Sequence, residues 1–100
     1  MTKMYRLDEF RTQLNILDEK LINILSERYQ ICRAIADFKK KHDIPMMQPA
    51  RVEEVKNRCA TMAKNKNLNP DFVRNLYTLI IDEACRLEDD IIDNKVENIK

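Results

Sequence analysis

The apolar residues between Leu7 and Phe38 recur at intervals of three and four positions with a single interruption. This spacing places them on one face of an α-helix, which is the pattern of a helix that packs along its whole length. We call this face the apolar seam; it consists of Leu7, Phe10, Leu14, Leu17, Leu21, Ile24, Ile31, Ile35 and Phe38. We therefore predict one long helix from about residue 6 to about residue 42.

A helix of this length needs a partner to cover its apolar seam. About 36 residues in a helix extend roughly 54 Å, whereas a compact chain of this size has a radius of gyration of only about 13 Å. Two shorter helices from the same chain cannot cover so long a face. We therefore predict that two copies of the chain form an intertwined helical homodimer.

The remainder of the sequence predicts two shorter helices. Pro49 suits the first turn of the second helix, and residues 64–69 form a polar connector. Asn69 is expected to cap the third helix, with Pro70 at its first position. The third helix has one apolar stripe and beside it a second one, formed by Tyr77, Ile81 and Ala84. We predict a single all-α domain over residues 1–100, with a frayed tail at 94–100.

The chain contains no glycine among its 100 residues. Phosphate-binding loops, dinucleotide-binding turns and nucleophile elbows all need glycine, so these functions are excluded. Tight hairpins are also disfavoured, which argues against a β-rich fold. The cysteines at 32, 59 and 85 lack zinc-ligand spacing and are interpreted as buried reduced thiols. We expect neither a metal nor a cofactor.

The charges are nearly balanced, with 18 Lys and Arg against 17 Asp and Glu. This balance argues against nucleic-acid binding through bulk positive charge. No apolar run approaches the roughly 18 residues that span a membrane, and the first residues lack the apolar region of a signal peptide. We expect a cytoplasmic protein with no nucleic-acid or membrane partner.

Arg28 interrupts the apolar seam, four positions after Ile24 and three before Ile31. An arginine whose stem packs while its guanidinium either extends into solvent or pairs with a carboxylate is one explanation. Lys39, however, projects within about 20° of Arg28 on an ideal helix and lies about 16 Å further along it. This pair of cations suits the binding of a small polyanion.

Two further arginines are candidates with alternative interpretations. Arg11 lies about 25 Å from Arg28 along the helix and about 100° around it, so both cannot serve one site within a single chain. In an antiparallel dimer, Arg11 reaches the Arg28–Lys39 site of the other copy; alone, it is a surface residue. Arg51 opens the second helix and is otherwise a solvated first-turn residue.

Glu88 continues the second stripe of the third helix, seven positions after Ile81. A boundary carboxylate near Arg86 or a neighbouring helix is the alternative interpretation. The Lys40–Lys41 pair and His42, at the end of the long helix, are interpreted as solvated.

These features together resemble the small all-helical chorismate mutases. The resemblance extends from Leu7 to about Ile92 and is carried by four segments. They are Arg11 with LNILDEKLINILSER ending at Arg28, Lys39 in DFKKKHDIP, Arg51 in QPARVEEV, and Glu88 in LYTLIIDEACRLED.

The resemblance implies an intertwined dimer with two active sites, each of which binds a small dicarboxylate and rearranges it within one molecule. It assigns the substrate carboxylates to Arg28 and to Arg11 of the partner chain, with Arg51 nearby. Lys39 and Glu88 are implied to bind the ether oxygen, where Glu88 helps only when it is protonated. The other implied contacts are Ile35, Ile81, Ala84, Gln48 and Val52.

Positions 48 and 52 leave the substrate open. Many members of the family carry acidic residues there, and one of those carboxylates contacts the ring hydroxyl at C4. The segment IPMMQPARVEEV instead resembles the subgroup that rearranges 4-amino-4-deoxychorismate, which we favour over chorismate. A related lyase that splits pyruvate from isochorismate ranks third. A non-catalytic helical dimerisation or ligand-binding module is the alternative from another class.

Overall fold

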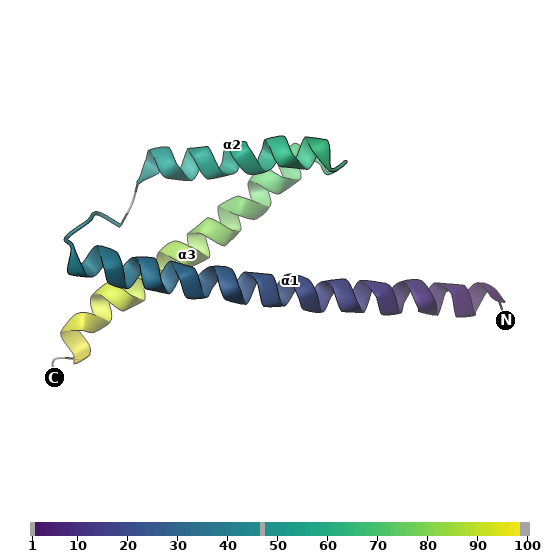
Figure 1. The fold of residues 1–100 in the computed structure, drawn as a ribbon, viewed down its shortest axis with the longest axis horizontal. Coiled ribbons are helices and arrows are strands. Elements are labelled where there is room, and N and C mark those ends of the chain that lie inside the picture. The colour runs from purple at the N-terminus through teal and green to yellow at the C-terminus, as the bar shows by residue number, and fades with distance from the viewer. Residues whose placement is uncertain (1, 47, 99–100) are drawn as a thin grey trace. The chain divides into compact units, whose positions relative to one another are not determined.

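A computed structural model describes residues 2–46 and 48–98. Three helices follow one another along the chain: α1 (Thr2–Lys41), α2 (Pro49–Asn65) and α3 (Pro70–Asn98) (Figure 1). The described residues contain no strand. The predicted all-α chain of three helices is therefore confirmed. None of the helices in the described ranges is both long and apolar enough to cross a membrane.

α1 begins earlier than predicted, at Thr2 rather than near residue 6, because the sequence offers no proline or glycine before Pro45 to interrupt it. α3 ends at Asn98, and the fraying expected of residues 94–100 stays a prediction. Residues 99 and 100 lie outside the described residues.

Both shorter helices begin as the sequence predicts. Pro49 occupies the first position of α2, and the carbonyl of Gln48 accepts the N–H groups of Arg51 and Val52 at 3.0 and 3.2 Å. Asn69 caps α3 through its side chain, whose Oδ1 accepts the N–H of Asp71 at 2.9 Å. This bond satisfies a donor that the helix itself leaves unpaired.

At the ends of α1 and α2, residues other than glycine adopt the left-handed backbone conformation. Asp43 and Asn67 adopt left-handed backbone conformations, with φ of 55° and 60°. The next residue then bonds back into the helix, with the N–H of Leu68 2.8 Å from the carbonyl of Ala63. Asp and Asn tolerate this conformation better than other residues with a side chain. They therefore take the place that glycine usually holds in this type of helix end.

The chain divides into two compact units, Met1–Ile31 and Cys32–Lys100. The first unit is a single helical segment of α1, and it contains no second element to cover its apolar residues. Side chains of the apolar seam are accordingly exposed: Leu14, Leu17, Leu21 and Ile24 have exposed fractions of 58, 56, 54 and 58%.

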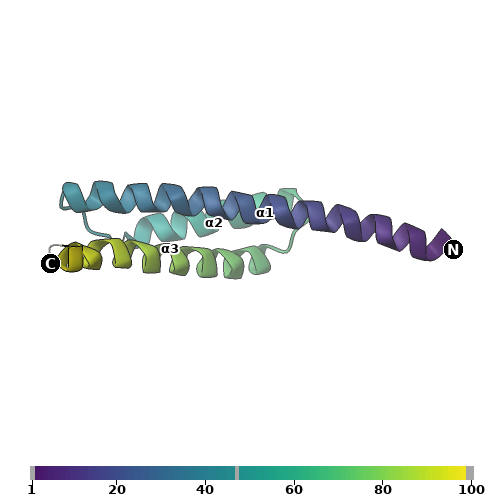
Figure 2. The same ribbon diagram turned by 90° about the horizontal axis from the view of Figure 1, so that it is seen from below.

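The second unit contains the last turns of α1 together with α2 and α3. Its hydrophobic core lies between α2 and α3, which meet at the connector that joins them (Figures 1 and 2). The buried members of this core are Val55, Cys59, Ala63 and Val73, and Tyr77 and Ile81 pack against them. On the outside, Arg74 of α3 pairs with Glu53 of α2 at 3.2 Å. The second unit thus has a core of its own.

Candidate active site

Lys39 of α1 and Glu88 of α3 form an ion pair inside the second unit. The distance from Lys39 Nζ to Glu88 Oε1 is 3.3 Å, and the two side chains are only 16 and 11% exposed. An unpaired charge at such a position costs several kcal/mol of solvation, so the contact between the two groups offsets part of a cost that either would carry alone. The pair brings together two residues from distant parts of the sequence, both of them predicted site residues.

A second acceptor fixes the direction of the Lys39 ammonium. Nζ lies 2.8 Å from the carbonyl oxygen of Met46, in the connector that follows α1. An ammonium carries three N–H donors, and within the described residues these two acceptors occupy two of them. One donor therefore stays available for an oxygen of a bound molecule.

Small buried residues lie one turn before each member of the pair. Ala36 precedes Lys39 and is completely buried, and Ala84 precedes Glu88 and is 6% exposed. A small buried residue therefore stands one turn before each member of the ion pair on its own helix.

Arg86, a neighbouring cation on α3, does not pair with Glu88. Arg86 pairs instead with Glu83 at 2.7 Å and with Asp90 at 3.1 Å. The hydrogen bond from Arg86 lowers the pKa of Glu83. Glu88 therefore pairs with a residue of a neighbouring helix rather than with Arg86, which both of its interpretations allow, and its contact with a substrate stays a prediction.

The pKa of the Cys85 thiol depends on the charges of this site. Burial raises the pKa of its thiol, and the negative charge of Glu88 raises it further, while Lys39 acts in the opposite direction. The thiol therefore stays protonated at neutral pH. All three cysteines are free and reduced, and Cys32 and Cys59 are buried as expected, whereas Cys85 is half-buried.

The other predicted site residues of the second unit are not bonded to Lys39 or Glu88 in the described residues. Arg51 is exposed and pairs with Glu54 of its own helix, and Gln48 is exposed at the start of α2 without a side-chain cap. Val52 is half-buried and Ile35 remains 43% exposed. Their contact with a substrate stays a prediction.

The two candidate arginines of α1 belong to the first unit. Arg11 is exposed and forms a loose ion pair with Asp8 at 3.8 Å. Arg28 is half-buried. Their roles as carboxylate ligands also stay predictions.

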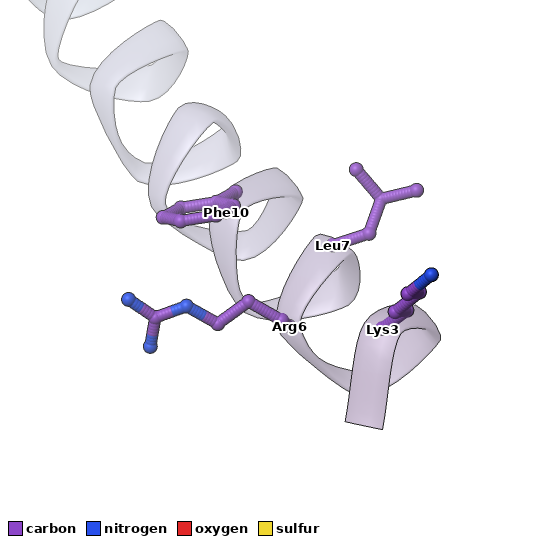
Figure 3. A pocket seen from close by; sticks show the side chains of 4 residues that line it. All are labelled: Lys3, Arg6, Leu7 and Phe10. Carbon is purple, nitrogen blue, oxygen red and sulfur yellow. The ribbon is translucent and has the colours of Figure 1, made fainter. Parts of the chain in front are cut away.

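Two surface hollows in the described residues are lined by residues other than Lys39 and Glu88. One, of about 570 Å³, lies open beside the first turns of α1 and is lined by Lys3, Arg6, Leu7 and Phe10. In Figure 3 the Arg6 side chain runs beside Phe10, and its guanidinium carbon lies 4.9 Å from the ring centre. Because a single helix lines this hollow, it is an exposed apolar surface rather than an enclosed site.

Lys40 is a residue whose role the sequence interpretation missed. It was expected to be solvated, but its Nζ donates a hydrogen bond to the carbonyl of Ile91 in α3, at 3.2 Å. Nothing in the run of three lysines distinguishes the lysine that reaches α3 from the one that remains in solvent. The acceptor is a backbone group, which leaves no trace in the sequence.

The chain belongs to the chorismate mutase type II family, which it matches over residues 10–89. This range includes every predicted site residue, from Arg11 to Glu88. The protein is therefore an enzyme of the isomerase class, as its resemblance to the all-helical mutases indicated.

Similar proteins indicate a particular group within the family. The 4-amino-4-deoxychorismate mutase of Streptomyces venezuelae is 42% identical over 89% of this chain and 86% of its own length. The protein of the same name from Streptomyces pristinaespiralis is 41% identical over 86% of this chain and 67% of its own. The chorismate mutase of Methanocaldococcus jannaschii is 22% identical over 83% of this chain and 84% of its own.

Proposed function

We propose that this protein converts 4-amino-4-deoxychorismate into 4-amino-4-deoxyprephenate at two sites shared within a homodimer. The observation that carries the proposal is the partly buried Lys39–Glu88 pair, which offers one free ammonium donor beside a carboxylate. The similarity to two proteins named 4-amino-4-deoxychorismate mutase supports the choice of substrate.

The reaction is an intramolecular rearrangement in which the ether C–O bond breaks while a new C–C bond forms. Negative charge grows on the ether oxygen as its bond to the ring breaks. The free N–H of Lys39 stabilises this charge, and a fixed donor in a site sheltered from water is effective because it needs no reorganisation. Arg28, together with Arg11 of a partner chain, holds the substrate carboxylates so that the flexible ether adopts its reactive conformation.

Glu88 distinguishes the amino substrate from chorismate in this proposal. An ionised carboxylate cannot donate a hydrogen bond to the ether oxygen, and it repels the charge that develops there. The amino substrate carries an ammonium group on the ring carbon next to the ether, where a carboxylate is a favourable partner. Val52, which is half-buried, offers no hydrogen-bond acceptor to a C4 hydroxyl.

The exposed apolar seam supports the homodimer. Four consecutive seam residues of the first unit are more than half exposed, and contiguous apolar surfaces of this kind mark protein interfaces. A second copy of α1 offers a matching face of the same length. The partner would also supply the Arg11 guanidinium to the site.

Three substrates test the proposal. The purified protein is mixed separately with 4-amino-4-deoxychorismate, chorismate and isochorismate, and consumption is followed by ultraviolet absorbance and product chromatography. We expect the amino substrate to have the highest kcat/KM, about tenfold or more above that of chorismate, because the Glu88 charge favours it by one charge-assisted bond. Faster release of pyruvate from isochorismate would identify a lyase, and no turnover of any substrate would identify a binding module.

Lys39→Met provides the internal check, with Lys41→Met as its matched control. Lys41 lies on the same helix end but is exposed, so its substitution removes the same charge without touching the site. The Lys39 variant should lose activity by about a hundredfold or more, in line with the loss of one oriented donor. Equal activities of the two variants would contradict the assigned role of Lys39.

A further inference from the structure

Two consecutive lysines of α1 bind α3 at successive turns. Lys39 Nζ contacts the Glu88 carboxylate at 3.3 Å, and Lys40 Nζ contacts the carbonyl oxygen of Ile91 at 3.2 Å. Glu88 and Ile91 are three positions apart, so they lie on the same side of α3. The end of α1 is therefore attached to α3 at two points.

Two points of attachment constrain more than one does. Neighbouring side chains leave a helix about 100° apart, so Lys39 and Lys40 approach α3 from different directions. The contact at Ile91 therefore adds a second polar restraint on rotation and sliding of this end of α1, beside the contact at Glu88.

The Ile91 carbonyl can accept this bond without losing its place in the helix. A carbonyl oxygen has two lone pairs, and α3 continues through this region to Asn98. The Lys40 side chain is half-buried, so its bond is sheltered from competing water and is worth more than an exposed one.

We infer that Lys40 is a positioning residue, which holds the end of α1 against α3 so that the Lys39 ammonium stays directed at its site beside Glu88. Its catalytic consequence rests on the proposed function. Lys40 acts through Lys39 and needs no contact with the substrate.

The chain provides a matched control at the next position. Lys41 has the same charge and the same place at the end of α1, but it is exposed and makes no side-chain hydrogen bond in the described residues. Lys→Met at either position keeps the length of the side chain and removes the ammonium. Lys40→Arg keeps a cationic donor, so it tests rescue.

The first measurement is kcat and KM for each variant with 4-amino-4-deoxychorismate. We expect Lys40→Met to lower kcat about tenfold while KM stays within about twofold, because a misplaced catalytic group affects the chemical step more than binding. Lys41→Met should leave both constants unchanged, and Lys40→Arg should recover at least half of the lost kcat. Equal effects at positions 40 and 41, or a failed rescue with an unchanged melting temperature, would overturn the inference.

The second measurement needs no substrate. Cys85 lies close enough to Lys39 and Glu88 for both charges to affect its thiol. If Lys40→Met displaces the ammonium, alkylation of Cys85 by iodoacetamide at a fixed pH of about 8 should slow by about twofold, since the thiolate loses a nearby cation. Lys41→Met is again the control.

The kinetic and the alkylation measurements distinguish the proposed function from the positioning role of Lys40. A wild-type protein without turnover on any substrate would refute the proposed function, yet a slower Cys85 reaction in Lys40→Met alone would still support the positioning role. Unchanged Cys85 reactivity together with unchanged kcat would overturn that role, whatever the substrate.

Discussion

The two units of the chain differ in how their apolar residues are covered. In Cys32–Lys100, α2 and α3 bury a core of their own around Val55 and Cys59. In Met1–Ile31, one helix carries most of the apolar seam, and Leu14, Leu17 and Leu21 are more than half exposed. The second unit therefore has a core within the chain, whereas the apolar seam of the first unit has no cover within that unit.

The candidate site follows the same division. Lys39, which acts on the ether oxygen in our proposal, and Glu88, which binds the ring ammonium, are already in contact within the second unit. Arg11 and Arg28, which bind carboxylates in our proposal, lie on the first unit. In the proposal, charge stabilisation thus belongs to the unit with its own core, and binding of the substrate carboxylates belongs to the unit that a partner chain would cover. The predictions below separate these two contributions.

Leu21→Asp should have the largest effect, because it places a carboxylate in the apolar seam of the first unit. Leaving an unpaired charge in an interface costs about 3 kcal/mol or more. We expect the dimer to dissociate at micromolar concentration and activity to fall more than a hundredfold. Analytical ultracentrifugation and the ultraviolet assay measure both changes.

Asn23→Asp is the control for this substitution. Asn23 is an exposed polar residue two positions further along α1, and it lies outside the apolar seam. This variant should remain dimeric and active. A dimeric Leu21→Asp protein would show that the apolar seam is not the interface.

Arg28→Ala and Arg11→Ala test how the two copies share a site. Each variant alone should lose about a hundredfold or more in kcat/KM, since each removes charge-assisted bonds worth about 1.5–3 kcal/mol apiece. Mixing the two should restore about a quarter of wild-type activity, because half of the dimers are hybrids and each hybrid has one intact site. If the mixture stays inactive after subunit exchange, Arg11 does not act across the dimer.

Glu88→Gln should have a smaller effect, confined to the second unit. We expect kcat/KM for the amino substrate to fall about tenfold, and that for chorismate to fall less, because only the ammonium group loses a charged partner. Removing the Glu88 charge also removes one of the causes that raise the pKa of Cys85. The thiolate fraction at a given pH therefore rises, and alkylation of Cys85 should become faster.

Glu83→Gln is the matched control on the same helix. Glu83 is bound to Arg86 rather than to Lys39, so its loss should leave both substrates unaffected. Equal losses for the two substrates in Glu88→Gln would remove Glu88 from the recognition of the amino group.

Asn67→Ala should have the smallest effect, on stability alone. The left-handed conformation at the end of α2 costs alanine about 1 kcal/mol more than it costs asparagine. Thermal unfolding should therefore show a melting temperature lower by a few degrees, with dimer dissociation unchanged. Asn67→Gly should show no such loss, and an equal loss in the glycine variant would mean that backbone strain is not the cause.

The helices and most of their boundaries follow from the sequence. Apolar spacing, Pro49 and the Asn69–Pro70 pair act within a few residues of chain, and helical hydrogen bonds are equally local. The same local logic marked Arg28 as an interruption of the apolar seam and placed Glu88 on a stripe of α3. The candidate residues could therefore be identified from the sequence, whereas their arrangement could not.

The tertiary structure decided which of these groups meet. Lys39 rather than Arg86 pairs with Glu88, and Lys40 reaches the Ile91 carbonyl while Lys41 does not. These choices depend on where the end of α1 lies against α3, which the spacing of residues along either helix does not determine. Periodicity fixes the direction of a side chain around its own helix, but the distance and angle to another helix arise only when both have packed. The residue types of the site could therefore be found from the sequence, and their bonds could not.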